Sequence, residues 1–382
     1  MKLPTLSISR GCQVTLAICL ALAASPASAY VTFGKGYTSK WGDDVYAGSG
    51  AVVTWGFMAD GTDVYPNTLP AKDGVSGSSS VSTLRSAIDA QYGAGSFNAA
   101  IENALSTWSA VANITFIGPK SDGGLPAGSP NATTPDIRIG AFHPAQSTYF
   151  ALVGAVSYGP PGIRNPGGDQ FPESGDLFLN LDGPGTFQHF QIVTGIEDVT
   201  PINYQYGNDL QELVLHELGH GAIGLGHPPH IPGETVDQRV MYVYDGDQDA
   251  PPCCQTLNHE LSADDIAGAQ FVYGIRGDYN RDSRVDAADY TIWRDTLGEH
   301  PQYSGDGADG NVDGVVNVLD YDVWNANFGT VGAVGVSSPP ADSTIAAAPE
   351  PSSLALLLLS AAILFIVAHR RRLTAAVKLC VV

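Results

Sequence analysis

The amino-acid sequence predicts an α+β domain built around a metal-binding helix, followed by a small all-α module of two paired calcium loops. Three observations support this fold class. Segments with strand-like alternation are mixed with segments that have helical spacing. A histidine pair at helical spacing, HELGH, occupies residues 216–220. An acidic segment that begins at Asp278 is repeated from Asp309.

The charge balance limits the partners that the chain can bind. Asp and Glu number 39 against 18 Lys and Arg, which gives a formal net charge of −21. A chain with this negative charge repels the phosphate backbone of nucleic acids, and we therefore expect no nucleic-acid partner.

The first 29 residues have the three parts of a signal peptide. Lys2 and Arg10 precede an apolar run from Val14 to Ala24, and the small residues Ala27–Ala29 follow it. This order predicts cleavage after Ala29 and export of the chain.

Residues 349–382 predict a second targeting segment. The apolar run Leu354–Ala368 would span about 22 Å as a helix, against about 30 Å for a hydrocarbon core. Arg370–Arg372 follow it and favour a cytoplasmic tail, hence contact with a membrane. Pro349–Pro351, the apolar run and the basic residues together resemble the PEP-CTERM sorting signal of bacterial exported proteins. The resemblance implies a cell-envelope or extracellular protein, anchored until this segment is processed.

Residues 30–274 have the composition of a mixed α and β domain, and residues 331–348 read as a linker. Helical spacing is expected along Phe97–Trp108. Cys253 and Cys254 are the cysteines that remain after loss of both ends, either as a strained vicinal disulfide or as thiols. Strands are expected at four places: Val52–Phe57, Ile114–Phe116, Ile137–Phe142 and Gly175–Gly183.

The candidate metal ligands lie on a helix that Asn208 or Asp209 could cap. His216 and His220 are four residues apart, so both imidazoles can reach one metal ion. Glu217 lies beside them and can act as general base towards a metal-activated water. A buried stripe is expected on the same helix, at Leu210, Val214 and Leu218.

The third metal ligand is expected just after this helix. Gly224 and Gly226 can end it, and Pro228 prevents its continuation. The chain can then turn back and present His227 to the metal, with His230 as the alternative ligand.

The segment HELGHGAIGLGH resembles the zinc signature HExxHxxGxxH of metzincin peptidases, and in particular that of the matrixins. Residues 239–247, RVMYVYDGD, are similar to the matrixin Met-turn, with Met241 below the zinc ligands. Residues 261–274 resemble the helix that closes a matrixin catalytic domain, and Ser262 and Asp265 form its expected capping box. The resemblance implies a metzincin (zincin-like) domain with a twisted mixed sheet, one catalytic Zn²⁺ ion and a protein or peptide substrate.

Two departures from that family matter. The second and third histidines, His220 and His227, are seven residues apart instead of six. We expect a local π-type widening or a longer turn to absorb the additional residue. No pro-segment with a zinc-blocking cysteine precedes Trp41. His143 and His189 are single candidates for the structural zinc of the family.

The acidic repeat predicts two calcium loops, offset by 31 residues. Calcium requires six to eight oxygen ligands, which loops of this spacing supply together with the carbonyl of position 7. Glycine at position 6 is present as Gly314 in the second loop, whereas Ser283 in the first predicts weaker binding. The expected ligands are at loop positions 1, 3, 5, 7, 9 and 12. In that order they are Asp278, Asn280, Asp282, Arg284, Asp286 and Asp289 in loop 1, and Asp309, Asn311, Asp313, Val315, Asn317 and Asp320 in loop 2.

Each loop precedes a helix that contains Tyr and Trp, an arrangement that resembles a type I dockerin over residues 275–330. The resemblance implies two Ca²⁺ ions and a cohesin-like docking partner. A calcium-stiffened spacer is the alternative. The sequence as a whole predicts an exported zinc endopeptidase, and the competing hypothesis is a surface adhesion or scaffold protein whose zincin domain binds without cleaving.

Overall fold

The computed structural model describes residues 30–32, 39–42, 47–66, 68–128, 134–145, 154–161, 175–182, 190–197, 200–202, 208–228, 239–242 and 256–333. Several predictions fall outside these residues: the signal peptide 1–29, the sorting segment 349–382, His189, His230 and the pair Cys253–Cys254.

The main sheet is mixed, as the sequence predicts. Its strands run in the order β4–β2–β5–β7–β6, and β3 also pairs with β5. The pairs β2–β4, β2–β5 and β5–β7 are parallel, whereas β6–β7 and β3–β5 are antiparallel. The bounds are β2 Ala51–Phe57, β3 Val75–Ser76, β4 Ile114–Ile117, β5 Ile137–Pro144, β6 Ala155–Ser157 and β7 Asp176–Asn180. The four predicted strands are therefore confirmed, and β6 forms one edge of the sheet.

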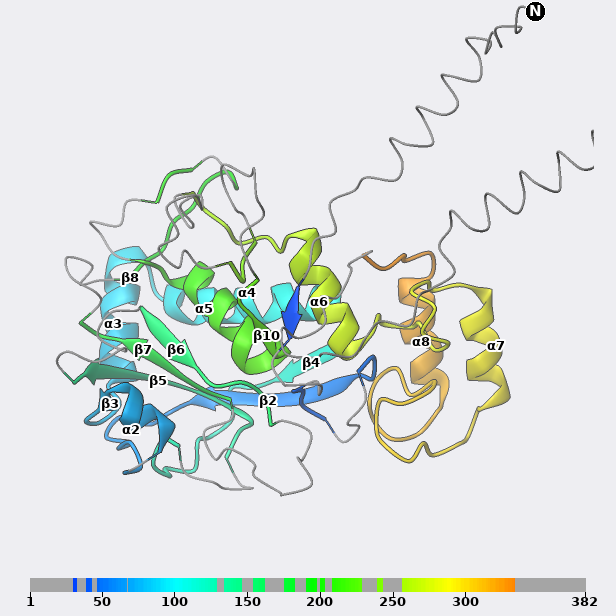
Figure 1. Ribbon diagram of the computed structural model, residues 1–382, viewed down its shortest axis with the longest axis horizontal. Helices are drawn as coiled ribbons and strands as arrows, with labels where there is room; N and C mark the ends of the chain where they lie inside the picture. Colours follow the sequence, from blue (N-terminus) through cyan, green and yellow to red (C-terminus); the bar gives the residue numbers. More distant parts are fainter. Residues whose placement is uncertain are drawn as a thin grey trace, which may run out of the picture. The chain divides into compact units, whose positions relative to one another are not determined.

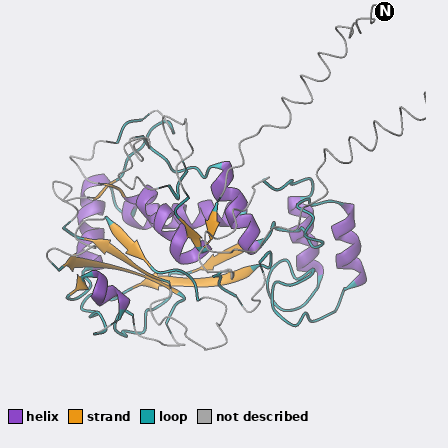
Figure 2. Ribbon diagram, viewed as in Figure 1, coloured by secondary structure: helices purple, strands orange, loops and turns teal. Residues whose placement is uncertain are grey.

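Helices α4, α5 and α6 lie over one face of this sheet (Figures 1 and 2). In α4 the predicted apolar positions Phe97, Ile101, Leu105 and Trp108 are all buried. Apart from α3, the remaining elements of the domain are short. The bounds are α2 Leu69–Asp73, α3 Val81–Tyr92, α4 Ser96–Val111, α5 Leu210–Leu218, η3 Gly219–Ile223 and α6 Ala263–Tyr273, with β1 Val31–Thr32, β8 Phe190–Gln191, β9 Asn208–Asp209 and β10 Leu225–Gly226.

The central strands are buried on both faces. Ile139 and Leu177 belong to the core shared with the helices, whereas Phe142 and Phe178 belong to a second cluster with Met58. Because successive side chains of a strand point to opposite faces, each strand serves both clusters.

A buried ion-pair cluster lies among the apolar residues of the sheet. Arg138 contacts Asp176 at 2.7 Å and Asp122 at 3.4 Å, and the three side chains are about 2% exposed. Burial raises the pKa of Asp176 to about 6, against the opposing effect of Arg138. This cluster ties β5 and β7 to the segment that follows β4.

Residues 275–333 contain two further helices, α7 Ala287–Asp295 and α8 Val318–Asn327. Each is capped by position 9 of its loop, Asp286 or Asn317, in a capping box. The tryptophans make reciprocal contacts, since Trp293 Nε1 donates to the Asn317 carbonyl at 2.7 Å and Trp324 Nε1 donates to the Asp286 carbonyl at 2.8 Å. The two copies of the repeat are therefore connected through their helices.

No helix in the described ranges has the length and apolar character that crossing a membrane requires. The apolar segment Leu354–Ala368 lies outside those ranges, so the predicted membrane contact stays a prediction.

Candidate metal centre

Helix α5 places two of the three candidate ligands. Asp209 is its N-cap, and the carboxylate accepts a hydrogen bond from Glu212 N at 2.9 Å. Leu210, Val214 and Leu218 are fully buried, which confirms the predicted stripe. The apolar face fixes the rotation of the helix and so the direction in which His216 points.

His220 lies in a π-helix, η3, and not in a continuation of α5. The π turn runs over Gly219–Ile223 and ends at Gly224, whose φ of 84° lies in the left-handed region that favours glycine. A π turn holds one more residue than an α turn. The predicted widening is therefore confirmed, and it accommodates the longer spacing between His220 and His227.

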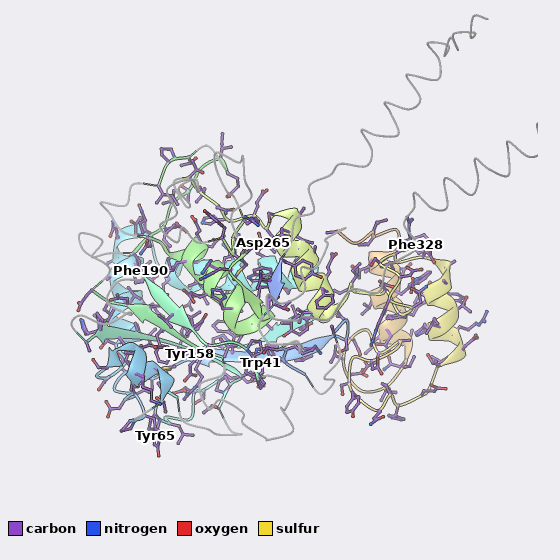
Figure 3. All side chains as sticks on the ribbon, in the orientation of Figure 1. Trp41, Tyr65, Tyr158, Phe190, Asp265 and Phe328 are labelled. Atoms are coloured by element: carbon purple, nitrogen blue, oxygen red, sulfur yellow. The ribbon has the colours of Figure 1, made fainter. Side chains whose placement is uncertain are left out.

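Two aromatic side chains hold the π turn from different parts of the chain. Trp41 Nε1 donates to the Gly221 carbonyl at 3.0 Å, and the Tyr273 hydroxyl donates to the Ala222 carbonyl at 2.8 Å. The Tyr273 hydroxyl also accepts from Trp41 N at 3.0 Å. Trp41 is labelled near the sheet in Figure 3. Buried carbonyls need such donors, so these contacts stabilise the irregular turn.

The structure brings the three predicted histidines together. The Nε2 atoms of His220 and His227 are 2.8 Å apart, and those of His227 and His216 are 3.2 Å apart. All the potential ligand atoms lie within 4.8 Å of one another. Tetrahedral zinc with Zn–N bonds near 2.0–2.1 Å requires nitrogens about 3.3 Å apart. One printed spacing is near this value and the other is shorter, so the three imidazoles are close enough together to share one ion.

The hydrogen bonds of these rings also fit a cation. His216 Nδ1 lies 2.6 Å from the Val240 carbonyl, and His220 Nδ1 lies 2.6 Å from the Leu225 carbonyl. A carbonyl only accepts, so each Nδ1 carries the proton and each neutral ring presents a lone pair at Nε2. Converging lone pairs repel one another unless a cation lies between them. The donor set therefore suits a metal ion.

Burial favours the neutral, metal-binding form of two of the imidazoles, those of His220 and His227. It lowers the pKa of His227 to about 4, with His216 as the second cause. Burial also lowers the pKa of His220 well below its usual value. Charging either ring would require a cation in a partly desolvated pocket beside two other imidazoles.

A buried carboxylate supports the segment below the histidines. Asp265, at the start of α6, accepts hydrogen bonds from Val240 N at 2.9 Å and from Met241 N at 3.2 Å (labelled in Figure 3). It also forms the predicted capping box with Ser262. Met241 is 1% exposed, and a Cβ at Gly219 would meet its sulfur at 2.0 Å. Asp265 thus holds the residue whose carbonyl orients His216.

Glu217 lies next to the imidazoles and is only 6% exposed. Burial raises the pKa of its carboxyl, while His216 and Ser157 oppose the rise. Oε2 accepts a hydrogen bond from the Ser157 hydroxyl at 2.6 Å. No local sequence pattern links Ser157, Trp41 or Tyr273 to the histidine helix, so their contacts with it could not be predicted.

The two acidic loops have the same internal hydrogen bonds. Asp278 and Asp309, at position 1, accept from the backbone N–H groups of positions 5 and 6. Asp289 and Asp320, at position 12, are fully buried and accept from backbone N–H groups of positions 3 and 9. Position 3 and position 5 are hydrogen-bonded through Asn280 with Asp282 and through Asn311 with Asp313.

Ser283, at position 6 of loop 1, has a φ of 68°, and Gly314, at position 6 of loop 2, has a φ of 84°.

Within the described ranges, the group of histidine, cysteine or carboxylate side chains that lie close enough to share one metal ion is formed by the three imidazoles. Calcium binding by either loop stays a prediction. His143 contacts Asp182 at 2.9 Å and lies apart from that histidine group.

A comparison with known proteins supports the metallopeptidase interpretation. The chain is similar to Metalloendoproteinase 1 of Glycine max, with 28% identity over 180 residues. The match covers 47% of this chain and 46% of that protein, so the chain spans less than half of the length of its relative. No protein-family model matches the chain. That relative is named as a metal-dependent peptidase, and this chain has a histidine group that could bind a metal ion.

Proposed function

We propose that this chain is an exported zinc-dependent endopeptidase of the matrixin type, with a metzincin domain over residues 30–274. The convergence of His216, His220 and His227 beside Glu217 is the observation that carries this proposal. The likeness to a named metalloendoproteinase supports it independently.

The residues of the site divide the chemistry between them. The three imidazoles would hold Zn²⁺ through Nε2, and zinc would supply Lewis-acid activation of a water molecule and of the scissile carbonyl. Glu217 takes a proton from the attacking water and later gives it to the leaving amine nitrogen. Its buried position next to His216 supports this role.

Strand β6 offers a place for the substrate backbone. It pairs with β7 on one side, and its other edge pairs with none of the described strands. An extended peptide can add to an open sheet edge through main-chain hydrogen bonds. We therefore propose that a protein or peptide substrate is bound along β6, next to Glu217.

Residues 275–330 and 349–382 complete the proposal. The exact repeat and the matching hydrogen bonds of its loops support a module that binds two Ca²⁺ ions and docks onto a cohesin-like partner. The C-terminal segment would hold the exported protein at the cell envelope by contact with the membrane. These assignments rest on the sequence.

The deciding experiment is a digest of a fluorogenic peptide library and of casein by the purified, zinc-loaded full chain. Cleavage that a zinc chelator stops is expected. Glu217→Gln should retain zinc and lower kcat by about 10²–10⁴-fold, because the general base is removed. Glu102→Gln, an exposed position on α4, is the matched control. Stoichiometric zinc without cleavage of any peptide would contradict the proposal and favour the adhesion or scaffold protein.

A further inference from the structure

A single serine on the edge strand contacts the proposed general base twice. The Ser157 hydroxyl lies 2.6 Å from Glu217 Oε2 and 2.8 Å from the Glu217 carbonyl oxygen. The two residues are 60 positions apart in the sequence. The contact therefore joins β6 to α5 directly.

The position of the serine is itself fixed. Ser157 pairs with Leu177 in the register of β6 and β7, and the next residue, Tyr158, donates its N–H to the Asp176 carbonyl at 3.1 Å. On the other side, a Cβ at Gly221 in the π turn would lie 3.5 Å from the Ser157 Cβ. The hydroxyl is thus held between the sheet and the histidine helix.

A buried carboxylate needs a partner of this kind. Glu217 has three rotatable side-chain bonds, and an ionised carboxylate away from water is costly unless it is hydrogen-bonded. A hydrogen bond from a hydroxyl to a charged acceptor is stronger than one between neutral groups. The serine therefore selects one orientation of the Glu217 side chain.

We propose that Ser157 is a positioning residue that holds the Glu217 carboxylate at the metal centre from the strand that binds the substrate. The inference rests on the proposed function and adds to it a residue for the orientation of the base. Because one strand would carry both the peptide and this hydroxyl, β6 sets the distance between the scissile carbonyl and the base. Accurate placement of the reacting groups accounts for a large part of the rate enhancement by enzymes.

The geometry suits both ends of the proton transfer. While Glu217 is ionised, the serine proton points to Oε2. When Glu217 takes the proton of the attacking water on Oε1, Oε2 can keep the hydrogen bond from the Ser157 hydroxyl, so the carboxyl stays in place. The proton leaves Glu217 for the amine nitrogen, and the first arrangement returns.

Three variants of the full chain test the proposal by peptide kinetics. Ser157→Ala should lower kcat by roughly 10–100-fold, the range found for partners that orient a metal site. KM and bound zinc should stay close to the original values, because the contact orients the base and binds neither substrate nor metal. Ser157→Thr keeps the hydroxyl and should recover most of kcat. Ser76→Ala, an exposed serine of strand β3, is the matched control.

Two kinetic results would overturn the assignment. An unchanged kcat in Ser157→Ala would show that Glu217 needs no such partner. A fall in kcat accompanied by loss of zinc in both the Ala and the Thr variants would show a structural role.

A second measurement separates this proposal from the proposed function. Unfolding of the zinc-free chain is compared for Ser157→Ala, Glu217→Ala and the double variant. We expect non-additive effects, since the first substitution removes the contact that the second would remove. Additive effects would overturn the contact. If the original chain cleaves no peptide, the proposed function fails, yet this cycle still decides whether Ser157 holds Glu217.

Discussion

Arg138 shows what one buried side chain does for this fold. Its guanidinium has two carboxylate partners, Asp122 and Asp176, inside the sheet. Replacing it by Met leaves Asp176 buried without its cation. We expect Arg138→Met to lower the free energy of unfolding by about 3–5 kcal/mol, measured by urea denaturation.

The pH dependence of that loss has a definite sign. The pKa of Asp176 in the folded chain is raised to about 6, and Arg138 opposes the rise. Without Arg138 the folded pKa lies still higher, so the folded state binds a proton that the unfolded state releases. The variant should therefore be less destabilised at pH 5, where Asp176 is protonated, than at pH 8. An equal loss at both values would contradict this account.

An exposed ion pair provides the control. Arg294 and Asp295 are in contact at 2.7 Å, with more than half of each side chain exposed. Arg294→Met should change stability by about 1 kcal/mol at most, because water screens such pairs.

At the same scale, the sequence identified the histidines and Glu217 but missed Ser157. His216 and His220 are four residues apart and Glu217 lies beside them, so their relation could be predicted from the spacing alone. Ser157 reaches Glu217 only because β6 packs against α5, a contact between segments that are distant in the sequence. Spacing carries no information about such a contact.

Among the elements, the π turn is the irregular one on which the metal centre depends. Tyr273→Phe removes the donor to the Ala222 carbonyl and the acceptor of Trp41 N. We expect a loss of about 1–3 kcal/mol in the free energy of unfolding, because buried polar groups lose their partners. Zinc affinity, measured by competition with a chromophoric chelator, should fall by about 10–100-fold.

Tyr92→Phe is the control, since the hydroxyl of Tyr92 has an exposed contact with Gln91. An unchanged zinc affinity in Tyr273→Phe would mean that the π turn keeps its form without this brace.

Several of the longer elements could be predicted from the sequence, whereas helix α3 and the shortest elements were not. Capping residues marked the starts of α5 and α6, and the extra residue before His227 pointed to the π turn. The pair β1–β10 has two residues in each strand. Elements this short have no periodicity, and they form only because the rest of the domain holds them together.

For the whole molecule, bound zinc should add to the stability of the fold. Zinc at about 100 times its Kd contributes about 2.7 kcal/mol. A nitrogen chelator that prefers zinc to calcium should therefore lower Tm by roughly 5–10 °C in a thermal scan. His227→Ala should show little of this effect.

His143→Ala should keep the full effect of the chelator, because His143 lies outside the group of three imidazoles. A loss of the effect in His143→Ala alone would mean that the zinc is bound elsewhere.

At this scale the sequence predicted the class of the fold and the mixed sheet. The strand order and the central place of β5 between β2 and β7 could not be predicted, because they depend on pairings between distant segments. The proposed boundaries at residues 274 and 330 stay predictions.

Because each tryptophan contacts the loop of the other copy, the two copies of the acidic repeat depend on each other. Trp293 of the first copy donates a hydrogen bond to the loop of the second copy, and Trp324 of the second copy donates one to the loop of the first. If one copy were removed, the remaining loop would lose the tryptophan that contacts it. The tryptophan of the remaining copy would lose its carbonyl partner and be exposed to water. A second molecule could supply the missing half, so we expect truncation to favour pairing between two chains.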